Sequence, residues 1–306
     1  MKLGKKPFRV PERPNPLAVA TSSLKVNIDD VPVRVGYPRA SSILSSCLRM
    51  HVLGSKFELY RKRKFNSLPS RIAFSIGNAY HHWIQNSPDI YGDTRRGWWK
   101  CLACRKVTHF GAPPIKNCPH CGAYPEAIQY MEHPMVIKGT PWYFSGHPDL
   151  YLITGTKLKD HLVTNELKSI KNSGNGESWD WDELIEPMAD HKAQVMGYMI
   201  NSEYDDIFKK KGILIDSTVA RISYIAKGNF GNLLPIKTFE VIRKDHKDIE
   251  EQIKGRLLIF KKAYENFPKF LPECFDKCKH AEFTNYQAKD CPALKQCKDF
   301  FEQGMK

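Results

Sequence analysis

Two acidic residues and a lysine occur in a pattern that strongly constrains how this chain can fold. Asp149 ends a Gly-His-Pro-Asp step and is followed directly by an apolar, strand-like run. Residues 161–168 form a second such run, and because side chains alternate along a strand, Glu166 and Lys168 point the same way. A turn at Gly155 can fold the two runs into a hairpin. We therefore predict that two carboxylates and one amine meet on one face of a β-sheet, where they could hold a divalent cation.

The spacing of apolar residues predicts several helices around this hairpin. Helices are expected at 41–53, 71–85, 187–201 and 246–266, and strands within 128–170 and at 219–225 and 239–242. This order is typical of an α/β fold with a mixed central sheet flanked by helices. We expect one main domain at 38–306, preceded by a Pro-rich arm at 1–37 that is irregular or disordered.

The chain is strongly basic. It has 47 Lys and Arg against 33 Asp and Glu, a formal net charge of +14. This surplus favours a polyanionic partner such as nucleic acid, although a basic protein without such a partner has the same composition. No apolar run reaches the ~18 residues of a membrane span, and the N-terminus lacks the apolar stretch of a secretory signal. We therefore expect a cytoplasmic protein with no membrane partner.

Nine cysteines fall mostly into two groups, which in a chain without a secretory signal favours metal sites over disulfides. The first group forms two C-x-x-C knuckles, separated by thirteen residues, and consists of Cys101, Cys104, Cys118 and Cys121. This spacing predicts a zinc ribbon inserted at 98–124, in which four thiolates hold one Zn²⁺. The ribbon could be purely structural, or it could also contact nucleic acid through its basic side chains.

The second group lies in a cysteine-rich segment at 270–300 and consists of Cys274, Cys278, Cys291 and Cys297. Cys47 stands alone near the N-terminus. Four cysteines at irregular spacing could hold a second Zn²⁺ by themselves, and Cys47 would then be a buried thiol.

Two further motifs flank the hairpin. Gly77 and His81 form a Gly-x-x-x-His motif on one predicted helix, and Gln194 and Tyr198 form a Gln-x-x-x-Tyr motif on another. With Cys47 before them and the other cysteines after, the series resembles that of the PD-(D/E)XK nuclease superfamily. The match is to its RecB-like exonuclease branch, which includes the iron–sulfur nucleases of CRISPR adaptation and their phage relatives.

The resemblance covers most of the chain beyond the N-terminal arm. It implies a restriction-endonuclease-like fold and a metal-dependent active site. Asp149, Glu166 and the backbone carbonyl of Leu167 would bind Mg²⁺ or Mn²⁺, which lowers the pKa of a bound water. Lys168 would orient that water and offset the negative charge. His81 would be a metal ligand or lie beside the metal, and its imidazole would favour Mn²⁺.

Gln194 and Tyr198 share a helical face because they lie four residues apart. The resemblance implies that both border the active site. Gln194 would hydrogen-bond a phosphate or a catalytic group. Tyr198 would stack on, or hydrogen-bond to, the end of the DNA, whereas its alternative role is packing in the core.

The resemblance also implies a [4Fe–4S] cluster. The expected ligands are Cys47, Cys278, Cys291 and Cys297. The family places its second cysteine where this chain has Ala288. Because of that departure, Cys274 is an alternative to Cys278 as a ligand.

The function implied is that of a metal-dependent DNA exonuclease that hydrolyses phosphodiester bonds from single-stranded DNA ends. Its expected setting is recombination, repair or phage genome processing, in a bacterial or phage-infected cell and with a helicase or recombination partner. Two alternatives remain at this stage. One is a structure-specific endonuclease of the same superfamily, and the other is a non-catalytic nucleic-acid-binding protein.

Overall fold

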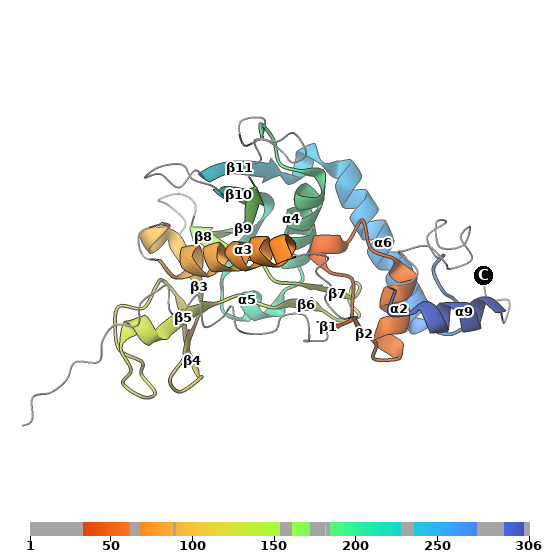
Figure 1. Ribbon diagram of the computed structural model, residues 1–306, viewed down its shortest axis with the longest axis horizontal. Helices are drawn as coiled ribbons and strands as arrows, with labels where there is room; N and C mark the ends of the chain where they lie inside the picture. The colour runs from red at the N-terminus through yellow and green to blue at the C-terminus, as the bar shows by residue number, and fades with distance from the viewer. Residues whose placement is uncertain are drawn as a thin grey trace, which may run out of the picture.

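The computed structural model describes residues 33–61, 68–87, 90–153, 161–171, 181, 184–227, 236–273 and 291–302. In this part of the chain a mixed central sheet is flanked by helices (Figure 1), as the order of predicted elements indicated. None of the helices described is both long enough and apolar enough to cross a membrane.

The central sheet has the strand order β11-β10-β9-β8-β3-β4, and β5 pairs with the edge of β3 opposite β4. These strands are β3 (Arg95–Cys101), β4 (Val107–Gly111), β5 (Ile128–Met131), β8 (Leu150–Ile153), β9 (His161–Lys171), β10 (Leu214–Lys227) and β11 (Ile236–Ile242). β9 and β10 are parallel, whereas the other pairs in this sheet are antiparallel. Parallel neighbours need a long crossover, and here it contains α4 (Ala189–Ser202) and α5 (Asp206–Lys210).

Smaller elements surround this sheet. Two short antiparallel pairs are β1 (Val33–Arg34) with β2 (Tyr60–Arg61), and β6 (Met135–Ile137) with β7 (Phe144–Gly146). The other helices are α2 (Leu48–Lys56), α3 (Leu68–Asn86), α6 (Lys247–Glu265) and α9 (Leu294–Glu302). The short 3₁₀ helices are η2 (Ala40–Ser42), η3 (Gly92–Thr94), η4 (Pro125–Ala127) and η5 (Arg243–Asp245).

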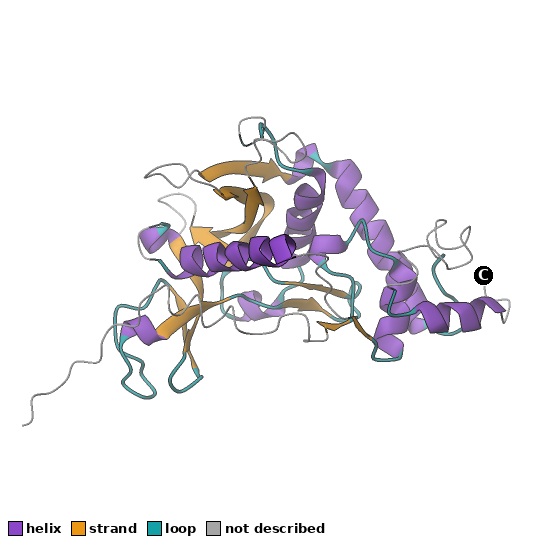
Figure 2. Cartoon of the chain, in the orientation of Figure 1, coloured by secondary structure: helices purple, strands orange, loops and turns teal. Residues whose placement is uncertain are grey.

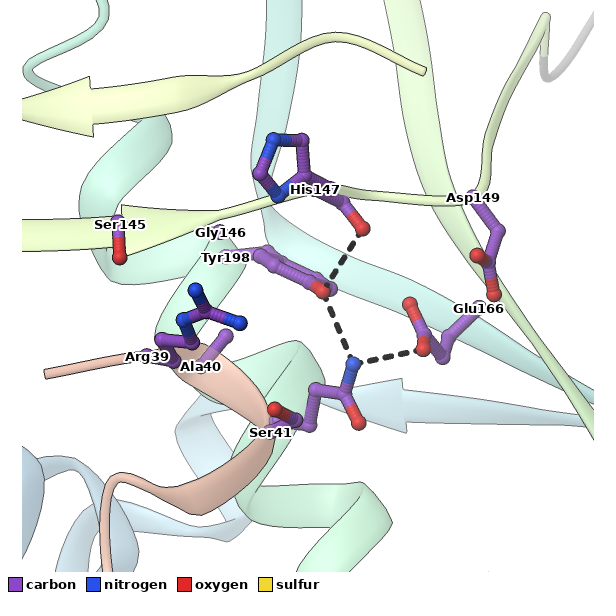
Figure 3. Close-up of a pocket in the computed structure, with 10 residues that line it drawn as sticks. Arg39, Ala40, Ser41, Ser145, Gly146, His147, Asp149, Glu166 and Tyr198 are labelled. Carbon is purple, nitrogen blue, oxygen red and sulfur yellow. Dashed lines mark hydrogen bonds between the residues drawn. The ribbon is translucent and has the colours of Figure 1, made fainter. Parts of the chain in front are cut away.

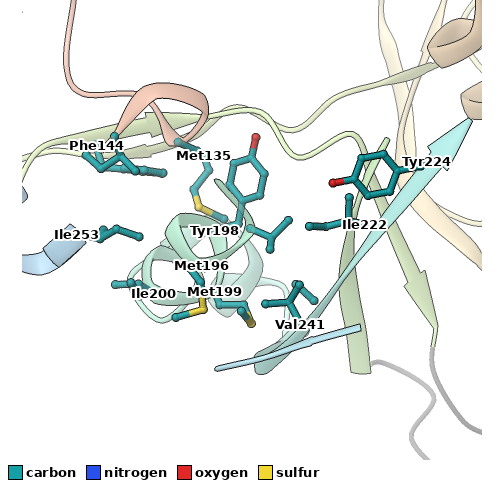
Figure 4. Close-up of a cluster of buried hydrophobic side chains, with 14 of the residues drawn as sticks. Met135, Phe144, Met196, Tyr198, Met199, Ile200, Ile222, Tyr224, Val241 and Ile253 are labelled. Carbon is teal, nitrogen blue, oxygen red and sulfur yellow. The ribbon is translucent and has the colours of Figure 1, made fainter. Parts of the chain in front are cut away.

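Alternation along β9 sends successive side chains to two different hydrophobic clusters. Leu167 packs with Ile84 of α3, whereas Ile170 packs with residues of α4. Helices α3 and α4 therefore cover opposite faces of the sheet (Figure 2). Figure 4 shows the α4 cluster, in which Ile222 and Tyr224 of β10 face the helix. This layering positions the two predicted helix motifs on either side of β9.

The predicted helix at 41–53 is wrong at its beginning, because α2 starts at Leu48 with Cys47 as its extended N-cap. The guanidinium of Arg256, on α6, donates to the carbonyls of Ile43 and Ser46. A continuous helix would use both carbonyls internally. The cation therefore stabilises a break that leaves η2 and α2 as separate elements. β1 pairs with β2 from Val33 on, ahead of the expected domain start at residue 38.

Candidate active site and cysteine metal centre

The β8–β9 hairpin brings the two predicted carboxylates together. Leu150 pairs with Asn165, so Asp149 falls where the next cross-strand partner of Glu166 would be. The Asp149 carboxylate takes over the pairing, because its Oδ2 accepts the backbone N–H of Leu167 at 2.7 Å. The N–H and C=O of one strand residue point the same way. The Leu167 carbonyl therefore points to the side where Asp149 lies.

Glu166 is 3% exposed, and its two oxygens differ in their partners. Oε1 accepts from Lys168 Nζ at 2.7 Å and from Gln194 Nε2 at 2.6 Å. Oε2 is buried and has no hydrogen-bond partner among the described residues. Burial first, and the nearby Asp149 second, raise the pKa of Glu166 well above its usual value, against the lowering effect of Lys168. A buried carboxylate oxygen without a donor is costly unless a cation or proton meets it.

His81 and His82 lie on different sides of α3. The Nδ1 of His81 is 3.5 Å from Oδ1 of Asp149, whereas His82 is exposed and bonds the side chain of Gln129. Gly77 makes this approach of the helix possible, because a Cβ there would lie 2.7 Å from the Oγ of Ser169 on β9. The glycine of the Gly-x-x-x-His motif thus lets α3 lie close enough for His81 to reach Asp149.

The donor set at this point fits a divalent cation that prefers oxygen ligands. Two carboxylates meet, one oxygen of Glu166 is buried without a partner, and an imidazole lies beside Asp149. His81, Asp149 and Glu166 do not, however, bring their ligand atoms within 4.8 Å of one another as a group of three. Asp149 is the member that lies close to both of the others.

Gln194 and Tyr198 face the site from α4. Gln194 accepts from Lys168 Nζ at 2.9 Å and donates to Glu166, so it holds both groups of the Glu-x-Lys motif. The Tyr198 hydroxyl accepts from Gln194 and donates to the carbonyl of His147. Its ring is 2% exposed and cannot stack on a DNA end, so the packing alternative holds for the ring. A Cβ at Gly146 would lie 2.7 Å from this ring, which explains the glycine of the Gly-His-Pro-Asp step.

These groups line a cavity of about 180 Å³. Figure 3 shows Asp149 and Glu166 on one side of it and Arg39, Ala40 and Ser41 on the other. Arg39 was not expected at this site, because it lies far before most of the lining residues in the chain and belongs to no recognisable motif, and Ser41 was expected only at the start of a helix. Glu132 was missed as well. Gln85 bonds both its carboxylate and the backbone carbonyl of Asp149.

The four cysteines of the first group are positioned to bind a metal ion. Their sulfur atoms all lie within 4.8 Å of one another. The Sγ–Sγ distances are 3.7 Å for Cys101 and Cys121, and 3.8 Å for Cys104 and Cys118. β3 carries Cys101 and belongs to the central sheet, so this centre is continuous with the sheet rather than a detached module.

The two knuckles have the same backbone form. The amide of Cys101 donates to the carbonyl of Lys106, and the amide of Cys118 donates to that of Ala123. In each knuckle the residue after the second cysteine has a positive φ, 62° for Arg105 and 74° for Gly122. Because this unusual backbone is repeated at both loops, the proximity of the four cysteines indicates a specific metal-binding geometry rather than chance.

The second cysteine group is described only in part. Cys297 is buried in a cluster formed by α2, α6 and α9, and Cys47 and Cys291 pack against the same cluster. Cys274 and Cys278 lie outside the described residues.

Comparison of the chain with family models, with curated proteins and with solved structures gave no match.

Proposed function

We propose that this protein is a metal-dependent deoxyribonuclease with a restriction-endonuclease-like core, related to the RecB-like branch of the PD-(D/E)XK superfamily. The observation that carries the proposal is the buried Oε2 of Glu166, which has no hydrogen-bond partner in the described part of the chain and lies beside Asp149 and near the ammonium of Lys168. A protein that merely binds nucleic acid gains nothing from two crowded, desolvated carboxylates near phosphates.

Asp149, Glu166 and the Leu167 carbonyl would hold Mg²⁺ or Mn²⁺, with His81 as a further ligand or neighbour. The bound ion would lower the pKa of a water and neutralise charge on the phosphate. Crowding of the carboxylates is what such an ion relieves, because it replaces mutual repulsion with attraction on both sides.

The protein's own residues would prepare the site before substrate arrives. Lys168 is fixed by two hydrogen bonds, so its ammonium is oriented without further loss of entropy. There it would position the attacking water and offset negative charge on the phosphate. Gln194 holds Lys168 and Glu166 together, and Tyr198 holds Gln194. The amide and the phenol would thus be positioning residues.

We propose Zn²⁺ for the four-cysteine centre. A tetrahedral ion with Zn–S bonds of about 2.3 Å separates its sulfurs by about 3.8 Å, which agrees with the Sγ–Sγ distances of the two cysteine pairs. Thiolates that bind different irons of one cluster would lie farther apart. Arg105, Lys106 and Lys116 are exposed on this part of the chain and could contact phosphates.

We propose a [4Fe–4S] cluster for the second group, with Cys47, Cys291 and Cys297 as three of its ligands. Their packing around one hydrophobic cluster supports a set that includes Cys47. A second Zn²⁺ held by the four C-terminal cysteines would instead leave Cys47 out. Metal analysis and absorbance near ~400 nm on an anaerobic preparation separate the two.

The proposed substrate is a single-stranded DNA end, in recombination, repair or phage genome processing, with a helicase or recombination protein as partner in the cytoplasm. The net charge of +14 supports a nucleic-acid substrate.

The test is digestion of 5′- and 3′-labelled oligonucleotides by purified protein with Mn²⁺, Mg²⁺ or EDTA. We expect metal-dependent release of short products, and its abolition in Glu166→Gln. Glu186→Gln is the matched control, because Glu186 is an exposed carboxylate that also pairs with a lysine. Closed circular single strands should survive, and their cleavage would favour the endonuclease alternative. Binding without metal-dependent cleavage by the wild type would overturn the proposal.

A further inference from the structure

The wall of the cavity opposite the carboxylates has a fixed backbone. Arg39 forms a parallel β-bridge with Ser145 of β7. The backbone N–H of Ser145 donates to the carbonyl of Pro38 at 3.0 Å. Ala40 is 2% exposed and packs on Gly197 of α4. The side chains of this wall therefore project from a rigid base.

The two cations that line or border the cavity differ in their bonding. The ammonium of Lys168 donates hydrogen bonds to Glu166 and Gln194. Arg39 is exposed, and its guanidinium makes no hydrogen bond or ion pair within the described part of the chain, although it lies across the cavity from two carboxylates (Figure 3).

The size of the cavity limits what can lie between the two walls. Its volume of about 180 Å³ is below the roughly 300–1,000 Å³ of pockets that enclose a whole small-molecule ligand. The charged and polar groups that line this space suit a phosphate group with a metal ion better than a nucleobase. A guanidinium offers a planar, two-pronged donor that matches two phosphate oxygens, and the Ser41 hydroxyl lines the same wall.

We propose that Arg39, assisted by the Ser41 hydroxyl, binds the non-bridging oxygens of a phosphate in the nucleic-acid strand. The strand is then held between this wall and the metal-binding carboxylates. This inference rests on the proposed nuclease function and adds a substrate-binding wall that the sequence motifs do not contain.

The test is the salt dependence of single-stranded DNA binding, measured in a Glu166→Gln background that cannot cleave. Each phosphate contact to a single strand contributes about 0.7 to the slope of log K against log salt. Arg39→Ala should lower the slope by about that amount and weaken binding by roughly tenfold. Arg39→Lys should keep the slope but lose part of the affinity, because the charge stays and the two-pronged geometry is lost.

Arg34→Ala is the matched control, because Arg34 is an exposed arginine of the same segment that already pairs with Glu58. It should keep the parent slope and affinity. In the cleavage-competent protein, Arg39→Ala should raise KM more than it lowers kcat. Thermal unfolding of each variant checks that the fold is kept.

Equal slopes for Arg39→Ala and Arg34→Ala, with a wild type that cleaves, would overturn this inference and leave the nuclease function standing. A wild type that neither binds nor cleaves DNA would overturn both.

Discussion

Two regions of the central sheet hold charged groups in opposite ways. In the carboxylate region, around the central β8–β9 pair, residues from η2, α3, the β8–β9 hairpin and α4 bring buried carboxylates together, and Oε2 of Glu166 has no hydrogen-bond partner among the described residues. In the cysteine region, formed by β3, β4 and β5, four cysteines from one short stretch meet within 4.8 Å. In the first case the fold stabilises a costly arrangement of charge. In the second, a bound ion would stabilise the fold.

The sharpest contrast should come from Lys168→Met, which removes the charge but keeps the length of the side chain. We expect cleavage to slow by about 10²–10³-fold, because a preorganised cation is lost at the point where charge develops. The amount of metal bound by the four-cysteine centre should not change. Lys254→Met, an exposed surface lysine, should remain close to the wild-type rate. Steady-state kinetics with metal analysis measures both, and a near-normal rate for Lys168→Met would contradict the assigned role.

Removing a cysteine should destabilise the cysteine region. Cys118→Ser should lose the bound ion and unfold the β4–β5 region, because binding of a structural zinc is worth about 10–16 kcal/mol in small zinc domains. Hydrogen exchange should show lost protection in β4 and β5 but retained protection in α4. His120→Ala changes an exposed residue of the same knuckle and should keep the ion. Equal loss of protection in β4, β5 and α4 would contradict this contrast between the two regions.

Close packing of α3 against β9 in the carboxylate region can be tested through Gly77. The added Cβ of Gly77→Ala would meet Ser169 Oγ at 2.7 Å, and we expect a cost of about 1–3 kcal/mol with reduced cleavage as His81 moves from Asp149. Ser169→Ala removes the obstructing oxygen and should restore part of both in the double variant. Denaturant unfolding and rates of all four proteins give the cycle. An additive result would show that the helix and strand do not depend on this contact.

Acid should destabilise the carboxylate region through His191, which lies on α4 and is affected by the charge of Lys168. Burial, and then the charge of Lys168, lower the pKa of His191 to about 4, compared with about 6.5 in an unfolded chain. The folded state thus binds fewer protons than the unfolded state between these values. Stability from this group is complete above pH 6.5 and is lost as the pH falls toward 4. His191→Gln should flatten the pH dependence by at least about 1.4 kcal/mol, measured by urea unfolding from pH 4 to 7.

What the sequence predicted well were features of local spacing. The hairpin that carries Asp149 and Glu166 is present, and so are the helices expected at 71–85, 187–201 and 246–266. The cysteine centre followed directly from two knuckles, because its geometry is set by a few neighbouring residues. These features depend on strand and helix periods and on turn chemistry, which a sequence displays.

Features that depend on contacts between distant segments could not be predicted. The regular apolar spacing on α3 indicated a helix, but Ile72, Ile76 and Trp83 are 41–49% exposed, and Gly77 and Ile84 face the sheet instead. Periodicity identifies a stripe and does not say what covers it. The position of Arg39 in the cavity could likewise not be predicted, because it depends on a backbone bridge to the distant Ser145.

The break between η2 and α2 is the kind of joint at which one part of a protein could swing against another. Arg256 prevents this, because one side chain of α6 holds carbonyls on the near and far parts of that joint. The wall that carries Arg39 is thus anchored by a helix that does not line the cavity. Arg256→Met should therefore loosen the grip on substrate more than it slows the chemical step, and an unchanged KM would show that the joint is held by other means.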